Sequence, residues 1–197
     1  ADAIVLCSFG DASANHSTAQ GAVNSACWAA YQQVPVPVLF VCEDNGLGIS
    51  TPTPSGWIEQ DLADRPALKY FAADSRDLAQ TYHIARRAAD YVRSKRKPAV
   101  LHLSTVRLFG HAGADAEAAY RTKAQIEAEL ELDPLLSSTA ALLATGSFTI
   151  VTGVGGAWPH AVFSGDPTFA LAFHKTRHAF FNRSSTQHFG VTKFHQH

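Results

Sequence analysis

Short apolar runs, separated by segments with helical spacing, constrain the fold of this chain more than any other feature of its sequence. The runs are continuous rather than alternating, which is the pattern of strands buried on both faces. We expect strands at residues 3–9, 37–42, 69–74 and 99–106. We expect helices at residues 18–33, 77–95 and 122–132. The alternation predicts an α/β fold: a parallel sheet with helices on both faces.

Composition excludes several classes of function. With 197 residues and 46% hydrophobic content, the chain is long enough for one domain with a core. Its formal net charge of -1 comes without a basic stripe on any predicted helix, and no apolar run has the length of a membrane span. The cysteines Cys7, Cys27 and Cys42 lie in apolar runs, so we expect core thiols in a reducing compartment. These features predict a cytoplasmic protein that binds neither nucleic acid nor membrane.

The composition changes near residue 146. Residues 146–197 hold eight of the twelve phenylalanines and six of the ten histidines, but Asp166 is their one acid. No helical or strand period persists there beyond a possible strand at 148–151. We therefore predict one domain over residues 1–145 and an atypical Phe/His-rich tail at 146–197 without an assigned domain. Because methionine is absent, even at position 1, we also expect that the beginning of the protein is missing.

Polar side chains follow the first two predicted strands at the point where each strand ends. Asp11 follows the first strand, and the cluster Glu43-Asp44-Asn45 follows the second. The carboxyl ends of parallel strands meet at one edge of a sheet, where ligands bind. Mg²⁺ takes six oxygen ligands, of which proteins supply only a few. The Asp11 carboxylate, the Asn45 amide oxygen and the Leu47 carbonyl are candidate ligands, with Gly46 and Gly48 permitting a sharp turn. An aspartate that only caps a helix gives the same Gly-Asp pattern, so the residues alone leave both interpretations open.

Three stretches in order resemble one known family. They are "GDASANHSTAQGAVN", "PVLFVCEDNGLGISTPTP" and "VRLFGHAGADAEAAYRTKAQIEAELELDPL". The first two are similar to the thiamine diphosphate motif, and the third is similar to a mobile loop followed by a helix. Together they resemble the α-subunit type of the thiamine diphosphate-dependent dehydrogenase component of 2-oxo acid dehydrogenase complexes, over roughly residues 3–145. The spacing between the two motifs is longer than usual, as in forms that fuse the α and β parts.

The resemblance implies roles for individual residues. Asp11, Asn45 and the Leu47 carbonyl would bind Mg²⁺, and Ala12 and Ser13 would lie against the diphosphate. Two further residues, Arg107 and His111, would come from the loop after the fourth strand. His111 would lie near the cofactor phosphates and the substrate, as the candidate catalytic residue. Position 12 is alanine where the motif has glycine, and position 44 is aspartate where the motif has asparagine.

The resemblance also implies partners. The activity would be oxidative decarboxylation of pyruvate or a branched-chain 2-oxo acid, with acyl transfer to a lipoyl-bearing acyltransferase. The glutamate that activates the cofactor belongs to a β-type subunit or to the second half of a fused chain, so this chain alone is expected to be inactive. The alternative is an inactive truncated or degenerate fragment that keeps part of the fold, with a tail from a shifted reading frame.

Overall fold

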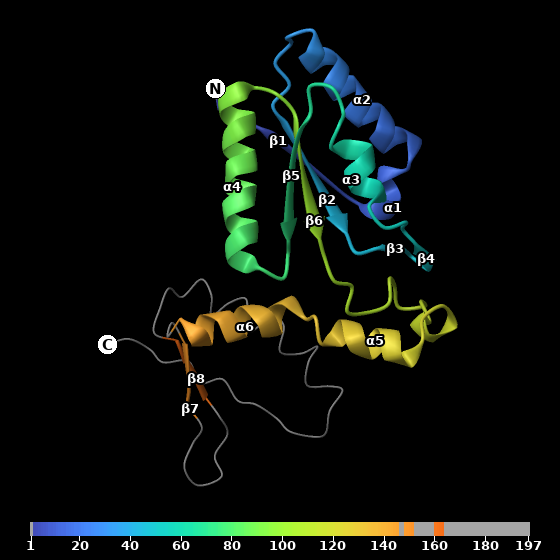
Figure 1. Ribbon diagram of the computed structural model, residues 1–197, viewed down its shortest axis with the longest axis vertical. Coiled ribbons are helices and arrows are strands. Elements are labelled where there is room, and N and C mark those ends of the chain that lie inside the picture. The colour runs from blue at the N-terminus through green and yellow to red at the C-terminus, as the bar shows by residue number, and fades with distance from the viewer. Residues whose placement is uncertain (1, 146–147, 152–159, 164–197) are drawn as a thin grey trace. The chain divides into compact units, whose positions relative to one another are not determined.

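The computed structural model describes residues 2–145, 148–151 and 160–163. The chain forms two compact units, Ala1–Ser138 and Thr139–His197. The first unit contains a four-stranded sheet in the order β1-β2-β6-β5, with every neighbouring pair parallel (Figure 1). Its strands are β1 (Val5–Gly10), β2 (Val38–Asp44), β5 (Lys69–Asp74) and β6 (Ala99–Ser104). All four lie where the apolar runs predicted them.

Helices fill the connections between these strands and also follow the last of them. They are α1 (Asp11–Ala14), α2 (Ser17–Tyr31), α3 (Trp57–Leu62), α4 (Leu78–Lys95), α5 (Lys123–Leu130) and α6 (Pro134–Ala144). A short hairpin of β3 (Leu47–Gly48) and β4 (Thr51–Pro52) follows β2, and a 3-10 turn spans Glu117–Ala119. The predicted helices correspond to α2, α4 and α5. Thr122 caps α5 in a capping box with Gln125, which confirms the predicted start of that helix.

The strand order explains why helices cover both faces of the sheet. From β1 to β2 to β5 the chain moves across the sheet in one direction, and from β5 to β6 it steps back. Because crossover connections between parallel strands are right-handed, connections that run in opposite directions lie on opposite faces. Accordingly α4 packs on one face, and α1, α2 and α3 lie on the other (Figure 1). The predicted α/β fold with both faces covered is thereby confirmed.

Side chains of the central strands alternate between two hydrophobic clusters. Phe40, Cys42 and Val100 pack against residues of α2 and α3, including Val23 and Ile58. Their neighbours Leu39, Ala99 and Leu101 pack against Ala88 and Val92 of α4. Strands β2 and β6 are therefore buried on both faces, which explains why their sequences are continuously apolar.

The prediction that β1 is fully buried is wrong. Val5 and Leu6 are 57% and 66% exposed, and Cys7 is exposed, whereas Cys27 and Cys42 are buried as expected. The reason is that β1 lies at one end of the strand order in the described part of the chain, so it has one strand neighbour.

The second unit contains an antiparallel pair, β7 (Phe148–Val151) with β8 (His160–Phe163). Strand β7 confirms the expected strand at 148–151. Most of the Phe/His-rich tail falls outside the described residues, and the domain boundary at 145 stays a prediction. Among the helices in the described ranges, none has the length and apolarity to cross a membrane.

Candidate functional site

Asp11 lies at the carboxyl end of β1, as the first residue of α1. The preceding residue, Gly10, pairs with Glu43 of β2, so the ends of these two strands are at the same level. Asp11 is 1% exposed, and its Oδ2 accepts a hydrogen bond from the Thr53 hydroxyl. The backbone N–H of Thr53 in turn donates to the Gly46 carbonyl at 2.9 Å. Thr53 therefore links Asp11 to the turn that follows β2.

That turn is held by side chains of its own residues. Asp44 Oδ1 accepts from the Gly46 N–H at 2.9 Å, and Asn45 Oδ1 accepts from the Leu47 N–H at 3.0 Å. Gly46 has a φ of 74°, a left-handed conformation that glycine adopts readily, consistent with the sharp turn expected there. The result is a tight turn that carries Asn45 and Leu47 at the sheet edge beside Asp11.

Gly48 has a different role from the one predicted. Its φ is not positive, but a Cβ built on it would lie 2.7 Å from the Cβ of Ala12. The positive φ in the hairpin belongs instead to Ile49, at 57°. Gly48 is required because α1 and β3 approach closely, and this contact brings the segment of Asp11 and Ala12 against the segment of Leu47. Ala12 and Ser13 are both exposed on α1.

The carboxylate of Asp11 lacks a cationic partner. Within the described residues no Lys, Arg or His forms an ion pair with it, and the Thr53 hydroxyl is its hydrogen-bond donor. A buried carboxylate is costly unless it is paired or coordinates a metal. No cluster of three or more His, Cys, Asp or Glu suited to a metal occurs in the described ranges. The candidate ligands Asp11, Asn45 and Leu47 differ from such a cluster, because they offer one carboxylate, one side-chain amide oxygen and one backbone carbonyl. Hard cations bind oxygen ligands of all three types.

The loop after β6 is organised around Arg107 and Tyr120. Arg107 Nη1 donates to the Ile49 carbonyl and Nη2 to the Tyr120 hydroxyl, both at 2.6 Å. Asp115 Oδ2 accepts from the Tyr120 hydroxyl at 2.6 Å and from the backbone N–H of His111 at 2.7 Å. The Tyr120 hydrogen bond is the largest cause that lowers the pKa of Asp115. Arg107 thus ties the β3–β4 turn to this loop, while the side chain of His111 is exposed.

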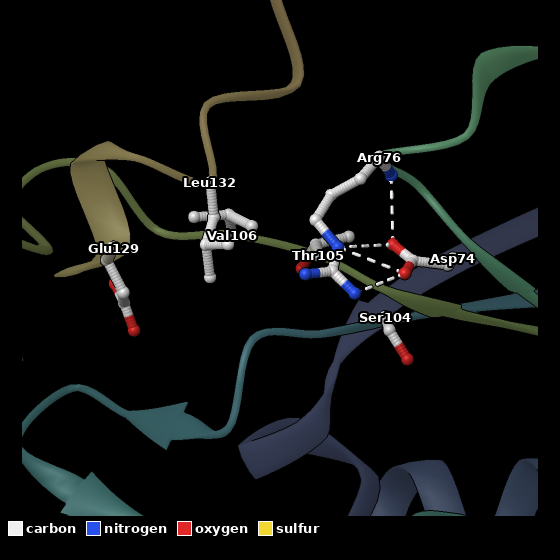
Figure 2. Close-up of a pocket in the computed structure, with 7 residues that line it drawn as sticks. All are labelled: Asp74, Arg76, Ser104, Thr105, Val106, Glu129 and Leu132. Carbon is white, nitrogen blue, oxygen red and sulfur yellow. Dashed lines mark hydrogen bonds and ion pairs between the residues drawn. The ribbon is translucent and has the colours of Figure 1, made fainter. Parts of the chain in front are cut away.

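A small cavity opens at the carboxyl ends of β5 and β6 (Figure 2). It is lined by Asp74, Arg76, Ser104, Thr105, Val106, Glu129 and Leu132, and its volume is about 170 Å³. Arg76 turns back onto the Asp74 carboxylate in this cavity, with its Nε 2.9 Å from Oδ1. None of the predicted site residues lines it, so it is separate from the candidate metal turn.

Three residues that were not predicted contact the candidate turn directly or through one partner. They are Thr53, His102 and Tyr70. Thr53 lies in "STPTP", which belongs to one of the three matched stretches. His102 contacts Asp44 from the neighbouring strand, and Tyr70 contacts His102; no local sequence pattern predicts either contact.

Comparison with known proteins shows which family this chain is similar to. The family described as "Dehydrogenase E1 component" matches residues 1–150. The human mitochondrial testis-specific pyruvate dehydrogenase E1 component subunit alpha is 32% identical over 141 residues, which cover 68% of this chain and 34% of that protein. The alpha subunit of acetoin:2,6-dichlorophenolindophenol oxidoreductase of Bacillus subtilis is 31% identical over 132 residues, or 65% of this chain and 38% of the relative. Mouse mitochondrial 2-oxoisovalerate dehydrogenase subunit alpha is 28% identical over 125 residues, which cover 62% of this chain and 27% of that protein.

The chain belongs to the dehydrogenase E1 component family. Within that family it is of the alpha-subunit type found in 2-oxo acid dehydrogenases, as the three motifs indicated. The chain spans about a third of the length of the curated relatives that it matches.

Proposed function

We propose that this chain is the diphosphate- and Mg²⁺-binding half of a thiamine diphosphate-dependent 2-oxo acid dehydrogenase. The observation that supports it most is the buried Asp11 carboxylate, which has no cationic partner in the described part of the chain and lies in α1, the helix that packs against β3 after the Asn45–Leu47 turn. A divalent cation at this edge would balance the buried charge.

The proposed metal ligands are the Asp11 carboxylate, the Asn45 amide oxygen and the Leu47 carbonyl. Asn45 already accepts one hydrogen bond, from the Leu47 N–H, and its oxygen has a second lone pair for a metal. The remaining positions of an octahedral site would be filled by water and by diphosphate oxygens. Ala12 and Ser13, exposed on α1 beside this turn, are the proposed neighbours of the diphosphate.

Arg107 and His111 complete the proposed site. The two Nη groups of Arg107 donate hydrogen bonds to the β3–β4 turn and to Tyr120. Its buried Nε has no hydrogen-bond partner among the described residues. We propose that Arg107 is one of the cofactor-binding residues. His111 has an exposed side chain, and its backbone is fixed by Asp115. An exposed imidazole on a loop at the carboxyl edge of a sheet is suited to hold or move a proton near the phosphates and the substrate.

Thiamine diphosphate, when bound, supplies the nucleophilic carbon for decarboxylation of a 2-oxo acid and carries the acyl group to a lipoyl-bearing acyltransferase. This chain would hold the metal and the diphosphate, and the loop that carries His111 would close over them. A β-type subunit or a fused second half supplies the activating glutamate, so we propose that the chain is inactive alone. The names of its relatives include pyruvate, acetoin and 2-oxoisovalerate. We propose the 2-oxo acid class without choosing one member.

Titration calorimetry tests the proposal. The full chain, mixed with a β-type subunit, is titrated with thiamine diphosphate with and without Mg²⁺. We expect saturable binding that requires Mg²⁺ and disappears in Asp11→Ala. The matched control is Asp64→Ala, the same change at an exposed aspartate, which should bind normally. Absence of binding in the wild-type mixture would reject the proposal and support the alternative, an inactive fragment that keeps the fold.

A further inference from the structure

A chain of hydrogen-bonded side chains crosses the sheet on the face that carries α1, α2 and α3. Tyr70 of β5 contacts His102 of β6, with 2.6 Å between the hydroxyl oxygen and Nδ1. His102 Nε2 lies 2.9 Å from Oδ2 of Asp44, at the end of β2. The side chains of His102 and Asp44 are 12% and 22% exposed. Three polar groups from three neighbouring strands are thus linked within a largely apolar face.

The strand register explains how these side chains reach one another. Tyr70 pairs with Val100, and His102 pairs with Cys42. Each link therefore runs to a residue two positions nearer the carboxyl edge of the adjacent strand. Diagonal neighbours of this kind are within reach of aromatic and long side chains. This row of hydrogen-bonded side chains leads from the interior of the sheet to the edge where β2 ends.

The direction of the hydrogen bonds follows from the protonation of Tyr70. Burial is the main cause that raises the pKa of this tyrosine to about 12, so the hydroxyl keeps its proton at neutral pH. With the imidazole neutral, the Tyr70 hydroxyl donates to Nδ1 of His102, and the other ring nitrogen carries the proton that it donates to Asp44. In this assignment Tyr70 selects the tautomer of His102 that can hold Asp44.

Asp44 transmits this constraint to the candidate metal turn. While Oδ2 is held by His102, Oδ1 accepts from the Gly46 N–H at 2.9 Å. The Asp44 carbonyl also accepts from the N–H of Thr105 at 2.7 Å. Fixing both carboxylate oxygens restricts the rotation of the side chain, and with it the backbone between Asp44 and Leu47. Asn45, a proposed metal ligand, lies within that backbone segment.

We propose that His102 and Tyr70 are positioning residues for the metal site, acting through Asp44 on the turn that carries Asn45 and Leu47. The inference rests on the proposed function. Residues that orient a metal-binding shell typically change metal affinity by about 10–100-fold when they are replaced. Buried polar groups are favourable only while their hydrogen bonds are made, so this network should hold one defined geometry.

The test measures the Mg²⁺ concentration that half-saturates thiamine diphosphate binding to the full chain mixed with a β-type subunit. His102→Phe keeps a flat ring and removes both hydrogen bonds, and it should raise this concentration about tenfold. His102→Gln, whose amide can donate to Asp44, should recover most of the loss. Tyr70→Phe removes one hydroxyl and should raise the concentration about threefold, a smaller loss of a single hydrogen bond. His83→Phe, at an exposed histidine of α4, is the matched control and should change nothing.

A double-mutant cycle separates positioning from a merely structural role. In an Asp44→Ala background, His102→Phe should have no further effect on the Mg²⁺ requirement, because the pathway is already broken. A purely structural role would lower the melting temperature and leave the half-saturating concentration of the folded variants unchanged.

The outcomes distinguish this inference from the proposed function. If the wild-type mixture shows no Mg²⁺-dependent binding, the proposed function fails and this inference fails with it. If the wild type binds and folded His102→Phe requires the same Mg²⁺ concentration within twofold, the positioning inference alone is overturned. Should His102→Phe not fold, Tyr70→Phe decides, and an unchanged requirement in that variant overturns the inference.

Discussion

Gly48→Ala should destabilise the protein through one contact. The added Cβ would lie 2.7 Å from the Cβ of Ala12, whereas ordinary van der Waals contact begins near 3.4 Å. The clash involves a methyl group fixed to the backbone of α1, so relief requires α1 and β3 to separate. Overpacking of this kind typically costs about 1–3 kcal/mol. The same separation would move Asp11 away from Leu47, so the variant should also bind Mg²⁺ and thiamine diphosphate less tightly.

Ala12→Gly should rescue Gly48→Ala. Once the methyl group at position 12 is removed, the nearest atoms to the new Cβ are the Thr51 carbonyl oxygen at 3.7 Å and the Cα of residue 12 at 3.8 Å, both ordinary contacts. Ala12→Gly alone should cost about 0.5–1 kcal/mol, the usual effect of glycine in a helix. The double variant should therefore be more stable than the sum of the two single changes predicts, with a coupling energy of about 1–3 kcal/mol.

Urea unfolding of the three variants measures these energies, provided that the slope of unfolding free energy with urea is unchanged. Gly21→Ala is the control, because no atom lies within 4 Å of its added Cβ in α2. That change should stabilise the protein by about 0.5–1 kcal/mol. Two results would contradict the predicted clash. One is an unfolding free energy of Gly48→Ala within about 0.5 kcal/mol of the wild type, and the other is additive effects of Gly48→Ala and Ala12→Gly.

Four further predictions concern the cysteines, the loop after β6 and the hairpin. Burial is the main cause that raises the pKa of Cys42 from 9.0 to about 12, so iodoacetamide at pH 9 should label exposed Cys7 and spare Cys42 in the folded protein, as mass spectrometry would show. The folded state holds the proton of the Cys42 thiol more tightly than the unfolded state does. The contribution of this group to the unfolding free energy is therefore complete below pH 9.0 and is lost as the pH rises towards about 12. An unfolding free energy that does not fall over this pH range would contradict the raised pKa of Cys42. Tyr120→Phe removes two hydrogen bonds in the loop, and trypsin should cleave that loop several-fold faster, whereas an unchanged rate would show that the bonds do not order it. Ile49→Asn should raise the unfolding free energy by about 1 kcal/mol, since a branched side chain is strained at a φ of 57°, and a loss of stability would argue against that strain.

The sequence predicted most of the regular structure of the first unit. Continuous apolar runs located the strands, and periodic spacing located α2, α4 and α5. Helices α3 and α6 were not predicted, and the six residues of α3 are too few to show a period. The exposure of β1 was also missed, because an apolar run reveals a strand and not its place in the strand order. That order depends on contacts between residues far apart in the chain.

The same limit applies to the candidate site. Asp11 and Asn45 could be predicted to lie at one edge of the sheet, because both follow parallel strands whose carboxyl ends are level. The contact of Thr53 with Asp11 joins residues 42 positions apart, and the contact of His102 with Asp44 joins residues 58 positions apart. Neither follows from local spacing. The second contact depends on β6 lying next to β2, which the four apolar runs did not specify.

The two outer strands of the sheet differ in how their edges meet solvent. Strand β5 begins with Lys69 and ends with Asp74, and charged residues at an outer strand discourage pairing with another chain. Strand β1 has the sequence VLCSFG, with no charged residue and with exposed Val5 and Leu6. Its outer backbone N–H and C=O groups can therefore template an additional strand. Because no strand of the described residues covers this edge, the protein alone should self-associate through it as its concentration rises.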